Sequence, residues 1–240
     1  MGWRWDVAEA DHEIQNPLSP EKVRLVGEYL RLGPESRVID VACGKGGPGR
    51  ILARTFGCRI TGIELREDWA EEARARAAGE GLGDLVEIHA GDAAAFPLEP
   101  EAWDAALCLG ATFVWGAMAE AAAALTPAVR RGGGVAIGEP FWHAWPLPSG
   151  DDDLGYVGLD ETVARLERSG AALTALVGSS TDDWDAYESL HWRAVEEWLA
   201  ANPQDPEAEA FRELHDRSRR EYLRIRRGAL GWAVFVARRP

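Results

Sequence analysis

The feature that most constrains the fold of this chain is a glycine-rich turn between two patterned segments. Residues 38–41 form a run rich in β-branched residues, the turn carries Gly44, Gly46 and Gly49, and residues 50–56 are amphipathic. A strand, a tight turn and a helix N-terminus in this order form a unit that binds anionic or polar groups. We therefore expect an α/β protein that holds a ligand at this turn.

Strand patterns alternate with helical patterns along the first half of the chain. A helix is predicted to begin at Pro20, after the capping residue Ser19, and to end at about Leu32. The segments that follow are predicted strands at 37–42, 58–63, 85–89, 103–109 and 134–139, with helices at 47–56, 67–79 and 116–125. This alternation specifies a parallel sheet with helices on both faces, the doubly wound, Rossmann-like α/β fold class.

The pattern changes after the fifth strand. Residues 140–158 are rich in Pro, Gly, Trp and Asp and are predicted to form a loop over the strand ends. The remaining predicted elements are a helix at 160–169, strands at 171–178 and 232–237, and helices between them that break near 202–206. The helical segment 182–228 exceeds an ordinary connection in length and is predicted to be an insertion that acts as a lid. We expect one domain over residues 1–240, with residues 1–35 as an N-terminal cap segment.

The composition argues against several classes of function. The net charge of −14 opposes binding to a phosphate backbone, so no nucleic-acid partner is expected, and the basic cluster 217–227 is predicted to be the solvated face of a helix. Three cysteines without CxxC or Cys/His spacing indicate neither a disulfide framework nor a metal site. No apolar stretch approaches membrane-spanning length and no signal core precedes the first helix, so we expect a cytoplasmic protein without a membrane partner.

Three acids stand at the ends of successive predicted strands. Asp40 lies in the end of the first strand, Glu64 follows the second and Asp92 follows the third. Ligands of open α/β sheets bind outside the carboxyl ends of the strands, so these carboxylates are expected to share one site. The glycines match the dinucleotide pattern G-x-G-x-x-G, and Glu64 lies 20 residues after Gly44, which favours a nicotinamide enzyme. Asp40, however, would repel a pyrophosphate and favours a cationic ligand group.

A set of short motifs occupies these strand ends in order: Asp40-x-x-Cys43-Gly44-x-Gly46, Glu64, Gly91-Asp92-Ala93, Trp103-Asp104 and Arg131-Gly132-Gly133. The set strongly resembles the motifs of class I S-adenosylmethionine-dependent methyltransferases over roughly residues 16–140. The stretches 109–112 and 137–142 look like a bacterial subgroup whose substrates are unassigned. The resemblance implies a seven-stranded sheet with an antiparallel last strand, S-adenosyl-L-methionine as cofactor, S-adenosyl-L-homocysteine as product, and a small-molecule substrate.

The resemblance also implies roles for individual residues. Asp40 and the backbone around Ala42 and Gly44 would hold the methionine amino and carboxylate groups, and Glu64 would accept hydrogen bonds from both ribose hydroxyls. Asp92 would accept a bond from the adenine amino group. The other residues expected at the cofactor are Asn16, Cys43, Gly46, Leu65, Ala93 and Leu109, of which Leu109 would offer its carbonyl to the cofactor ammonium. These pairings match donors of the cofactor with carboxylate and carbonyl acceptors.

The sequence departs from the family pattern at Ala42, where many members carry the first glycine. Because alanine occupies this position, we expect ordinary backbone angles there.

Four residues are candidates for a general base, which is needed only if the acceptor atom carries a proton at working pH. Glu139 and His143 are expected at the rim of the fifth strand. Tyr187 and His191 lie four residues apart on a predicted helix and so share one face. His143 could equally be an exposed loop residue, and the Tyr187–His191 face could be a packed helix seam.

Two further expectations concern the acceptor site. Four tryptophans, Trp142, Trp145, Trp184 and Trp192, could form an aromatic acceptor pocket or pack the insertion onto the sheet. We expect the N-terminal cap and the insertion to close over the site during turnover. Two other functions stay open on the sequence, an NAD(P)-dependent oxidoreductase and a non-catalytic protein that binds S-adenosylmethionine or S-adenosylhomocysteine.

Overall fold

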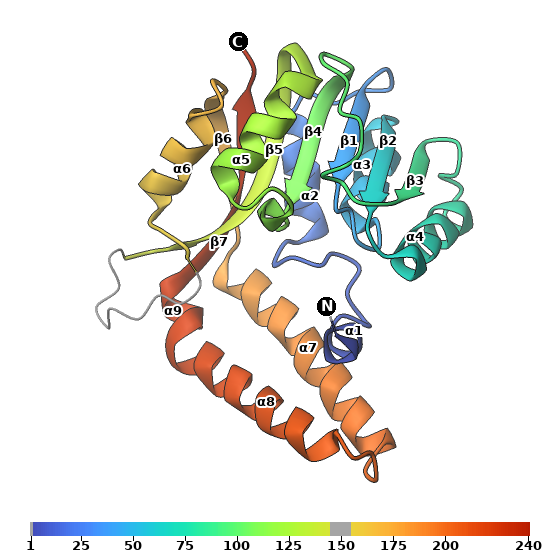
Figure 1. Cartoon of the computed structure of the whole chain (residues 1–240), viewed down its shortest axis with the longest axis vertical. Helices are drawn as coiled ribbons and strands as arrows, with labels where there is room; N and C mark the ends of the chain where they lie inside the picture. The colour runs from blue at the N-terminus through green and yellow to red at the C-terminus, as the bar shows by residue number, and fades with distance from the viewer. Residues whose placement is uncertain (1, 145–154) are drawn as a thin grey trace.

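A computed structural model describes residues 2–144 and 155–240 of the chain. Within these residues, one seven-stranded sheet forms the centre of the molecule, in the order β3-β2-β1-β4-β5-β7-β6 (Figure 1). β7 runs antiparallel to both β5 and β6, and the other neighbours are parallel. The strands are β1 (Arg37–Val41), β2 (Arg59–Glu64), β3 (Val86–Ala90), β4 (Trp103–Leu109), β5 (Val129–Trp142), β6 (Ala172–Gly178) and β7 (Leu230–Arg238). The predicted doubly wound fold class and the antiparallel last strand are confirmed.

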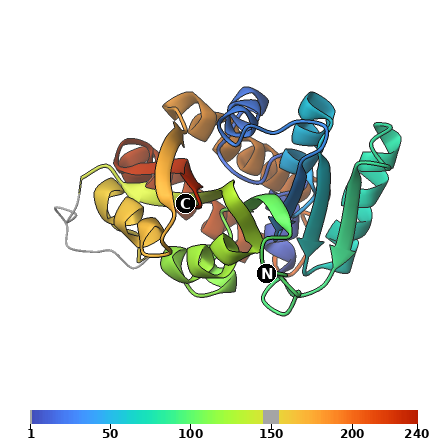
Figure 2. The same cartoon turned by 90° about the horizontal axis from the view of Figure 1, so that it is seen from above.

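Helices cover both faces of the sheet (Figure 2). One apolar core joins it to α2 (Pro20–Tyr29), α3 (Gly47–Phe56) and α4 (Glu67–Gly79). A second core, on the opposite face, joins it to α5 (Met118–Leu125) and α6 (Leu159–Glu167). Consecutive β1 residues show the pleat, because Val38 belongs to the first core and Ile39 to the second, and neither is exposed.

The N-terminal part of the chain differs from the prediction in two ways. Ser19 caps α2 as expected, since its Oγ accepts a hydrogen bond from the Lys22 backbone N–H at 3.3 Å, but the helix ends at Tyr29, short of Leu32. A short helix that the sequence did not suggest, α1 (Trp3–Ala8), precedes it. α1 packs against α7, and its stability rests on this contact rather than on its own length.

The fifth strand is longer than predicted. β5 pairs with β7 as far as Trp142, which faces Leu230, so residues 140–142 are strand and not loop. The antiparallel partner supplies hydrogen bonds that the local composition, with Pro140, did not suggest. Residues 145–154 of the predicted loop lie outside the described residues.

Between β6 and β7 the chain leaves the sheet as a helical arm. The arm consists of α7 (Thr181–Ala201), α8 (Ala208–Glu221), a π-helical turn (Tyr222–Arg226) and α9 (Arg227–Ala229). α7 and α8 extend from the carboxyl-end edge of β1–β4, and α1 lies beside α7 (Figure 1). A small separate core joins Val195, Leu199 and Phe211 of the arm to the N-terminal residues Val7 and Ala8.

The three cysteines are buried free thiols. In the part of the chain that the structure describes, no helix is both long and apolar enough to cross a membrane.

Candidate functional site

A pocket of about 350 Å³ opens at the carboxyl ends of β1, β2 and β4, where the strand order reverses beside β1. Its volume falls in the range of small-molecule sites. Ten of the eleven residues that the sequence suggested for a cofactor line it: Asn16, Asp40, Ala42, Cys43, Gly44, Glu64, Leu65, Asp92, Ala93 and Leu109. The exception is Gly46, which does not line the pocket and is the N-cap of α3, with φ 71°. A larger hollow, of about 580 Å³, lies at the opposite edge near Arg37 and Arg59, away from the strand ends where such folds bind ligands.

Asp40 is the most unusual group in the pocket. It is 2% exposed, and within the described residues its Oδ2 atom has no hydrogen-bond partner. Burial and the neighbouring Glu64 carboxylate raise its pKa to about 7. Since a buried polar atom without a partner destabilises the folded state, this oxygen suits a donor or a cation supplied by a ligand.

Glu64, at the end of β2, is held by two backbone donors. Gly44 N donates to its Oε2 at 2.9 Å, and Arg66 N donates to its Oε1 at 3.0 Å. Burial raises the pKa of Glu64, while these two bonds act in the opposite direction. Both oxygens keep further acceptor capacity in a fixed orientation, as two neighbouring hydroxyl donors require.

Asp92 follows β3 in a tight turn. Its Oδ1 accepts a hydrogen bond from Ala94 N at 2.9 Å, and the preceding Gly91 has an extended backbone. This turn leaves Asp92 at the pocket wall with Ala93 buried beside it.

The prediction of ordinary backbone angles at Ala42 was wrong. Ala42 has φ 52°, in the left-handed region, because the chain turns sharply out of β1 there. A side chain in this region costs about 1–2 kcal/mol relative to the right-handed region. The left-handed backbone angle explains why many family members carry glycine at this position, and this chain keeps the same angle with alanine.

The N-terminal segment crosses the glycine turn at very close range. Gln15 Oε1 accepts a hydrogen bond from Lys45 N at 2.9 Å, and Asn16 Nδ2 donates to the Leu109 carbonyl at 3.1 Å. A Cβ on Gly44 would lie 2.0 Å from Gln15 Oε1, and one on Gly110 would lie 2.4 Å from Asn16 Oδ1. These glycines therefore leave room for the N-terminal segment, a packing role that the sequence did not reveal. The Leu109 carbonyl, expected to accept from a cofactor, already has one donor and keeps its second lone pair.

Glu139 and His143 have different surroundings. Glu139 Oε2 accepts a hydrogen bond from the Thr112 hydroxyl at 2.9 Å, and Thr112 is adjacent to the pocket residues Ala111 and Phe113. Burial raises the pKa of Glu139 to about 7. His143 is exposed, stands edge-on to Phe141 at 5.2 Å between ring centroids, and is not among the residues that line the pocket.

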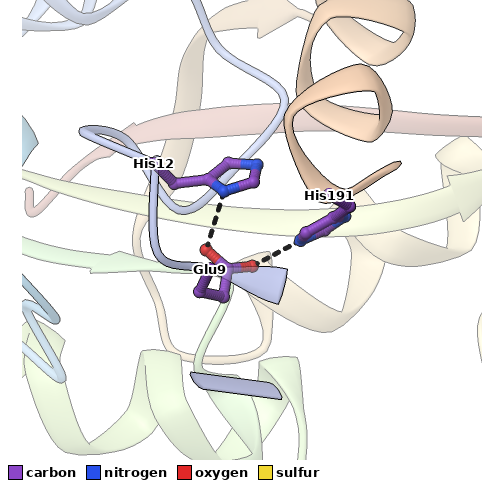
Figure 3. A group of neighbouring side chains, drawn as sticks. All are labelled: Glu9, His12 and His191. Carbon is purple, nitrogen blue, oxygen red and sulfur yellow. Dashed lines mark hydrogen bonds and ion pairs between the residues drawn. The ribbon is translucent and has the colours of Figure 1, made fainter. Parts of the chain in front are cut away.

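Tyr187 and His191 meet an acid that the sequence analysis missed. Both contact Glu9 Oε1, the Tyr187 hydroxyl at 2.9 Å as donor and His191 Nε2 at 2.8 Å (Figure 3 shows the histidine contact). His12 completes this cluster, which is separated from the pocket by Trp5, whose ring lies 5.6 Å from that of His191. Glu9 and Trp5 precede the region that carries the family motifs, so no motif indicated them.

The described tryptophans from the predicted aromatic pocket do not line the pocket. Trp184 packs against the first core, Trp192 stands against Tyr222 at 5.8 Å between ring centroids, and Trp142 is buried near Tyr156. Trp145 lies outside the described residues. The pocket tryptophans are instead Trp5 of α1 and Trp69 of α4.

Known proteins resemble this chain in both sequence and structure. A family model described as a methyltransferase domain matches residues 38–133. The uncharacterized protein YjhP of Escherichia coli (strain K12) is 31% identical over 240 residues, which cover 96% of this chain and 95% of that protein. A crystal structure of a SAM-dependent methyltransferase from Thiobacillus denitrificans in complex with S-adenosyl-L-homocysteine has a TM-score of 0.91 and 32% identity, and covers 100% of this chain and 99% of that chain.

A third relative is similar over a shorter stretch. The glycine/sarcosine/dimethylglycine N-methyltransferase of Actinopolyspora halophila is 34% identical over 86 residues, which are 36% of this chain and 15% of that protein.

Proposed function

The chain belongs to the class I S-adenosylmethionine-dependent methyltransferases, and from this premise we propose that it methylates a small molecule bound beside the Asp40 pocket. The observation that carries the proposal is Asp40, which lines the pocket with Glu64 and Asp92 and has a buried oxygen without a hydrogen-bond partner in the described residues. An ammonium group would satisfy that oxygen, whereas the pyrophosphate of a nicotinamide cofactor would meet repulsion.

The residue roles that the family resemblance implies agree with donor and acceptor chemistry. Asp40 would bind the amino group of the cofactor, Glu64 the two ribose hydroxyls, and Asp92 the adenine amino group. Trp69 lines the same pocket and would add apolar contact area. The cofactor supplies a methyl group already activated on its sulfonium, so the protein has mainly to position the acceptor and exclude water.

We place the acceptor at the β4 side of the pocket. Phe113 and Val114 line this side, and Phe113 is 62% exposed, so an apolar surface stands at the opening. A small acceptor agrees with the relative named as a glycine/sarcosine/dimethylglycine N-methyltransferase and with the acidic net charge of −14.

Glu139 is the general base that we propose among the four candidates. It accepts a hydrogen bond from Thr112, which stands between the pocket residues Ala111 and Phe113, and a pKa of about 7 suits proton transfer near neutral pH. His143 is exposed outside the pocket, and Tyr187 and His191 lie behind Trp5. None of the four candidates lines the pocket, so each would reach an acceptor only after a rearrangement, and Glu139 is the one bonded to a residue next to the lining.

Closure of the N-terminal cap (residues 1–35) and of the helical insertion (residues 182–228) over the ligands is part of the proposal. The cap already donates to Leu109 through Asn16, and α1 contacts α7. Limited proteolysis of both segments should slow when S-adenosylhomocysteine is bound. Equal cleavage rates with and without this ligand would contradict the closure.

Ligand binding and turnover test the proposal in two steps. S-adenosylmethionine and S-adenosylhomocysteine should raise the melting temperature, since a ligand that binds only the folded state stabilises it. Stabilisation by NAD(P)H alone would instead support an oxidoreductase. Formation of S-adenosylhomocysteine is then measured against a panel of small amines, hydroxylated compounds and thiols. Cofactor binding without turnover of any small or macromolecular acceptor would support a non-catalytic binding protein.

A further inference from the structure

The cluster of Glu9, His12 and His191 behind Trp5 contains buried polar atoms without hydrogen-bond partners. Glu9 and His12 have no exposed surface, and His191 has a side chain that is 13% exposed. The Glu9 carboxylate lies between the two imidazole rings, which come from the N-terminal segment and from α7 (Figure 3). Within the described residues, neither Glu9 Oε2 nor His12 Nδ1 has a hydrogen-bond partner.

The tautomer of His12 makes these two atoms face each other as acceptors. His12 Nε2 lies 3.0 Å from the Tyr187 carbonyl oxygen, which can only accept, so Nε2 carries a hydrogen. In the neutral ring Nδ1 then presents a lone pair. The Nδ1 atom lies 3.6 Å from Glu9 Oε2, beyond ordinary hydrogen-bond length, and neither atom is exposed to solvent.

No lysine or arginine side chain pairs with the Glu9 carboxylate in the described part of the chain. The nearby Lys45 ammonium donates to the backbone carbonyls of Glu9 and Ala10, at 3.0 and 3.2 Å, and pairs with Glu72 at 3.6 Å. The carboxylate itself contacts the two histidines and the Tyr187 hydroxyl. A buried carboxylate of this kind suits a cation that accepts lone pairs.

We propose that Glu9, His12 and His191 bind a divalent transition-metal ion of the Zn²⁺ type. Two imidazoles and one carboxylate are a ligand set that such ions prefer, whereas Mg²⁺ and Ca²⁺ prefer oxygen ligands alone. The Tyr187 carbonyl holds the His12 ring through its Nε2–H, as outer-shell carbonyls commonly do for metal-bound histidines. The Tyr187 hydroxyl holds Glu9 in the same way through Oε1.

The geometry requires only a small contraction. The three ligand atoms lie within 4.8 Å of one another. Ligands at about 2.0–2.1 Å from a tetrahedral Zn²⁺ are about 3.4 Å apart, so the widest separation would shorten by at most about 1.4 Å. The metal would replace the His191–Glu9 hydrogen bond and displace the proton on His191 Nε2. It would join the N-terminal cap to the helical arm, and three protein ligands would leave a fourth position for water.

Metal stoichiometry tests this inference on the full-length protein, independently of methyl transfer. After treatment with a chelator, the wild-type chain should bind one Zn²⁺, measured by elemental analysis after gel filtration, and its melting temperature should rise. His12→Gln and His191→Gln should lose the bound ion. The matched control His89→Gln, which changes an exposed histidine paired with Glu87, should keep it. Mg²⁺ and Ca²⁺ should leave the melting temperature unchanged.

A measurement on the wild type covers the case in which the variants do not fold. X-ray absorption of the Zn²⁺-loaded protein should report two imidazole ligands with oxygen and without sulfur. Sulfur ligation, retention of the ion by folded His12→Gln, or absence of Zn²⁺ binding by the wild type would each overturn the proposal. In the last case, a proton on His12 Nδ1 would lie between this atom and Glu9 Oε2 in place of the metal.

Discussion

Asp40 and Glu9 are both buried carboxylates, but their surroundings shift their pKa values in different directions. Asp40 stands in β1 with one oxygen unpartnered, and burial raises its pKa to about 7. Burial also acts to raise the pKa of Glu9, yet the hydrogen bond and the charge of His191 bring it below its usual value. Each acid has one oxygen without a hydrogen-bond partner in the described residues, Oδ2 of Asp40 and Oε2 of Glu9, but Glu9 Oε1 is held by Tyr187 and His191. A carboxylate without a partner lowers stability and prepares a binding site, while a partnered one joins segments of the fold.

The largest expected effect is that of Asp40→Asn on ligand binding. The affinity for S-adenosylhomocysteine should fall about 10- to 100-fold, which corresponds to the loss of one hydrogen bond to a charged group, about 1.5–3 kcal/mol. The melting temperature without ligand should be unchanged or higher, because the variant removes a buried charge. Isothermal titration calorimetry measures the affinity, and thermal unfolding measures the melting temperature. Thr174→Ser, on the distant β6, serves as the control, and an unchanged affinity in Asp40→Asn would remove the contrast between the two acids.

Tyr187→Phe should lower stability and leave the ligand affinity unchanged, the reverse of Asp40→Asn. It removes the hydroxyl that donates to Glu9 Oε1, so the free energy of unfolding should fall by about 1.5–3 kcal/mol. Affinity for S-adenosylhomocysteine should stay within about twofold, because the cluster lies outside the pocket. Chemical denaturation and calorimetry measure the two quantities, with the exposed Tyr29→Phe as control. A large loss of affinity with intact stability would mean that the cluster belongs to the ligand site.

The pH dependence of binding should separate the two acids further. The cofactor ammonium prefers ionised Asp40, so affinity should fall as pH falls below about 7, by at most tenfold per unit from this group. Asp40→Asn should flatten this part of the profile. If binding of the wild type is independent of pH between about 5 and 8, Asp40 does not bind the ammonium.

The stability of the ligand-free protein should change with pH in the reverse sense. The pKa of Asp40 is higher in the folded than in the unfolded chain, so its burial costs little at low pH and more as pH rises toward about 7. The melting temperature of Asp40→Asn minus that of the wild type should therefore increase between about pH 4 and pH 7. A difference that is constant over this interval would contradict the raised pKa.

The smallest expected effect is that of Ala42→Gly, beside Asp40. Glycine relieves the left-handed angle at the cost of a more flexible unfolded chain, so the net stabilisation should be about 0.5–1 kcal/mol. Thermal unfolding should show a rise of about 1–4 °C. Ala136→Gly in the middle of β5 should instead destabilise, since it gains flexibility without relieving strain.

The alternation of strands and helices, the acids at three strand ends and the glycine turn were all predictable from the sequence. Each belongs to one strand–turn–helix unit, in which neighbours in sequence are neighbours in space, and the fold class follows from how such units pack. The predicted pocket residues Asp40, Glu64 and Asp92 come together for this reason.

The tertiary structure alone decided the features that depend on the path of the chain. The left-handed angle at Ala42, the Asn16 contact to Leu109 and the added length of β5 depend on what a distant segment supplies. Glu9 and His191 are 182 residues apart and meet only because α1 packs on the helical arm. Sequence spacing specifies local hydrogen bonds and periodicity, whereas contacts between distant segments are selected by the packing of the whole molecule.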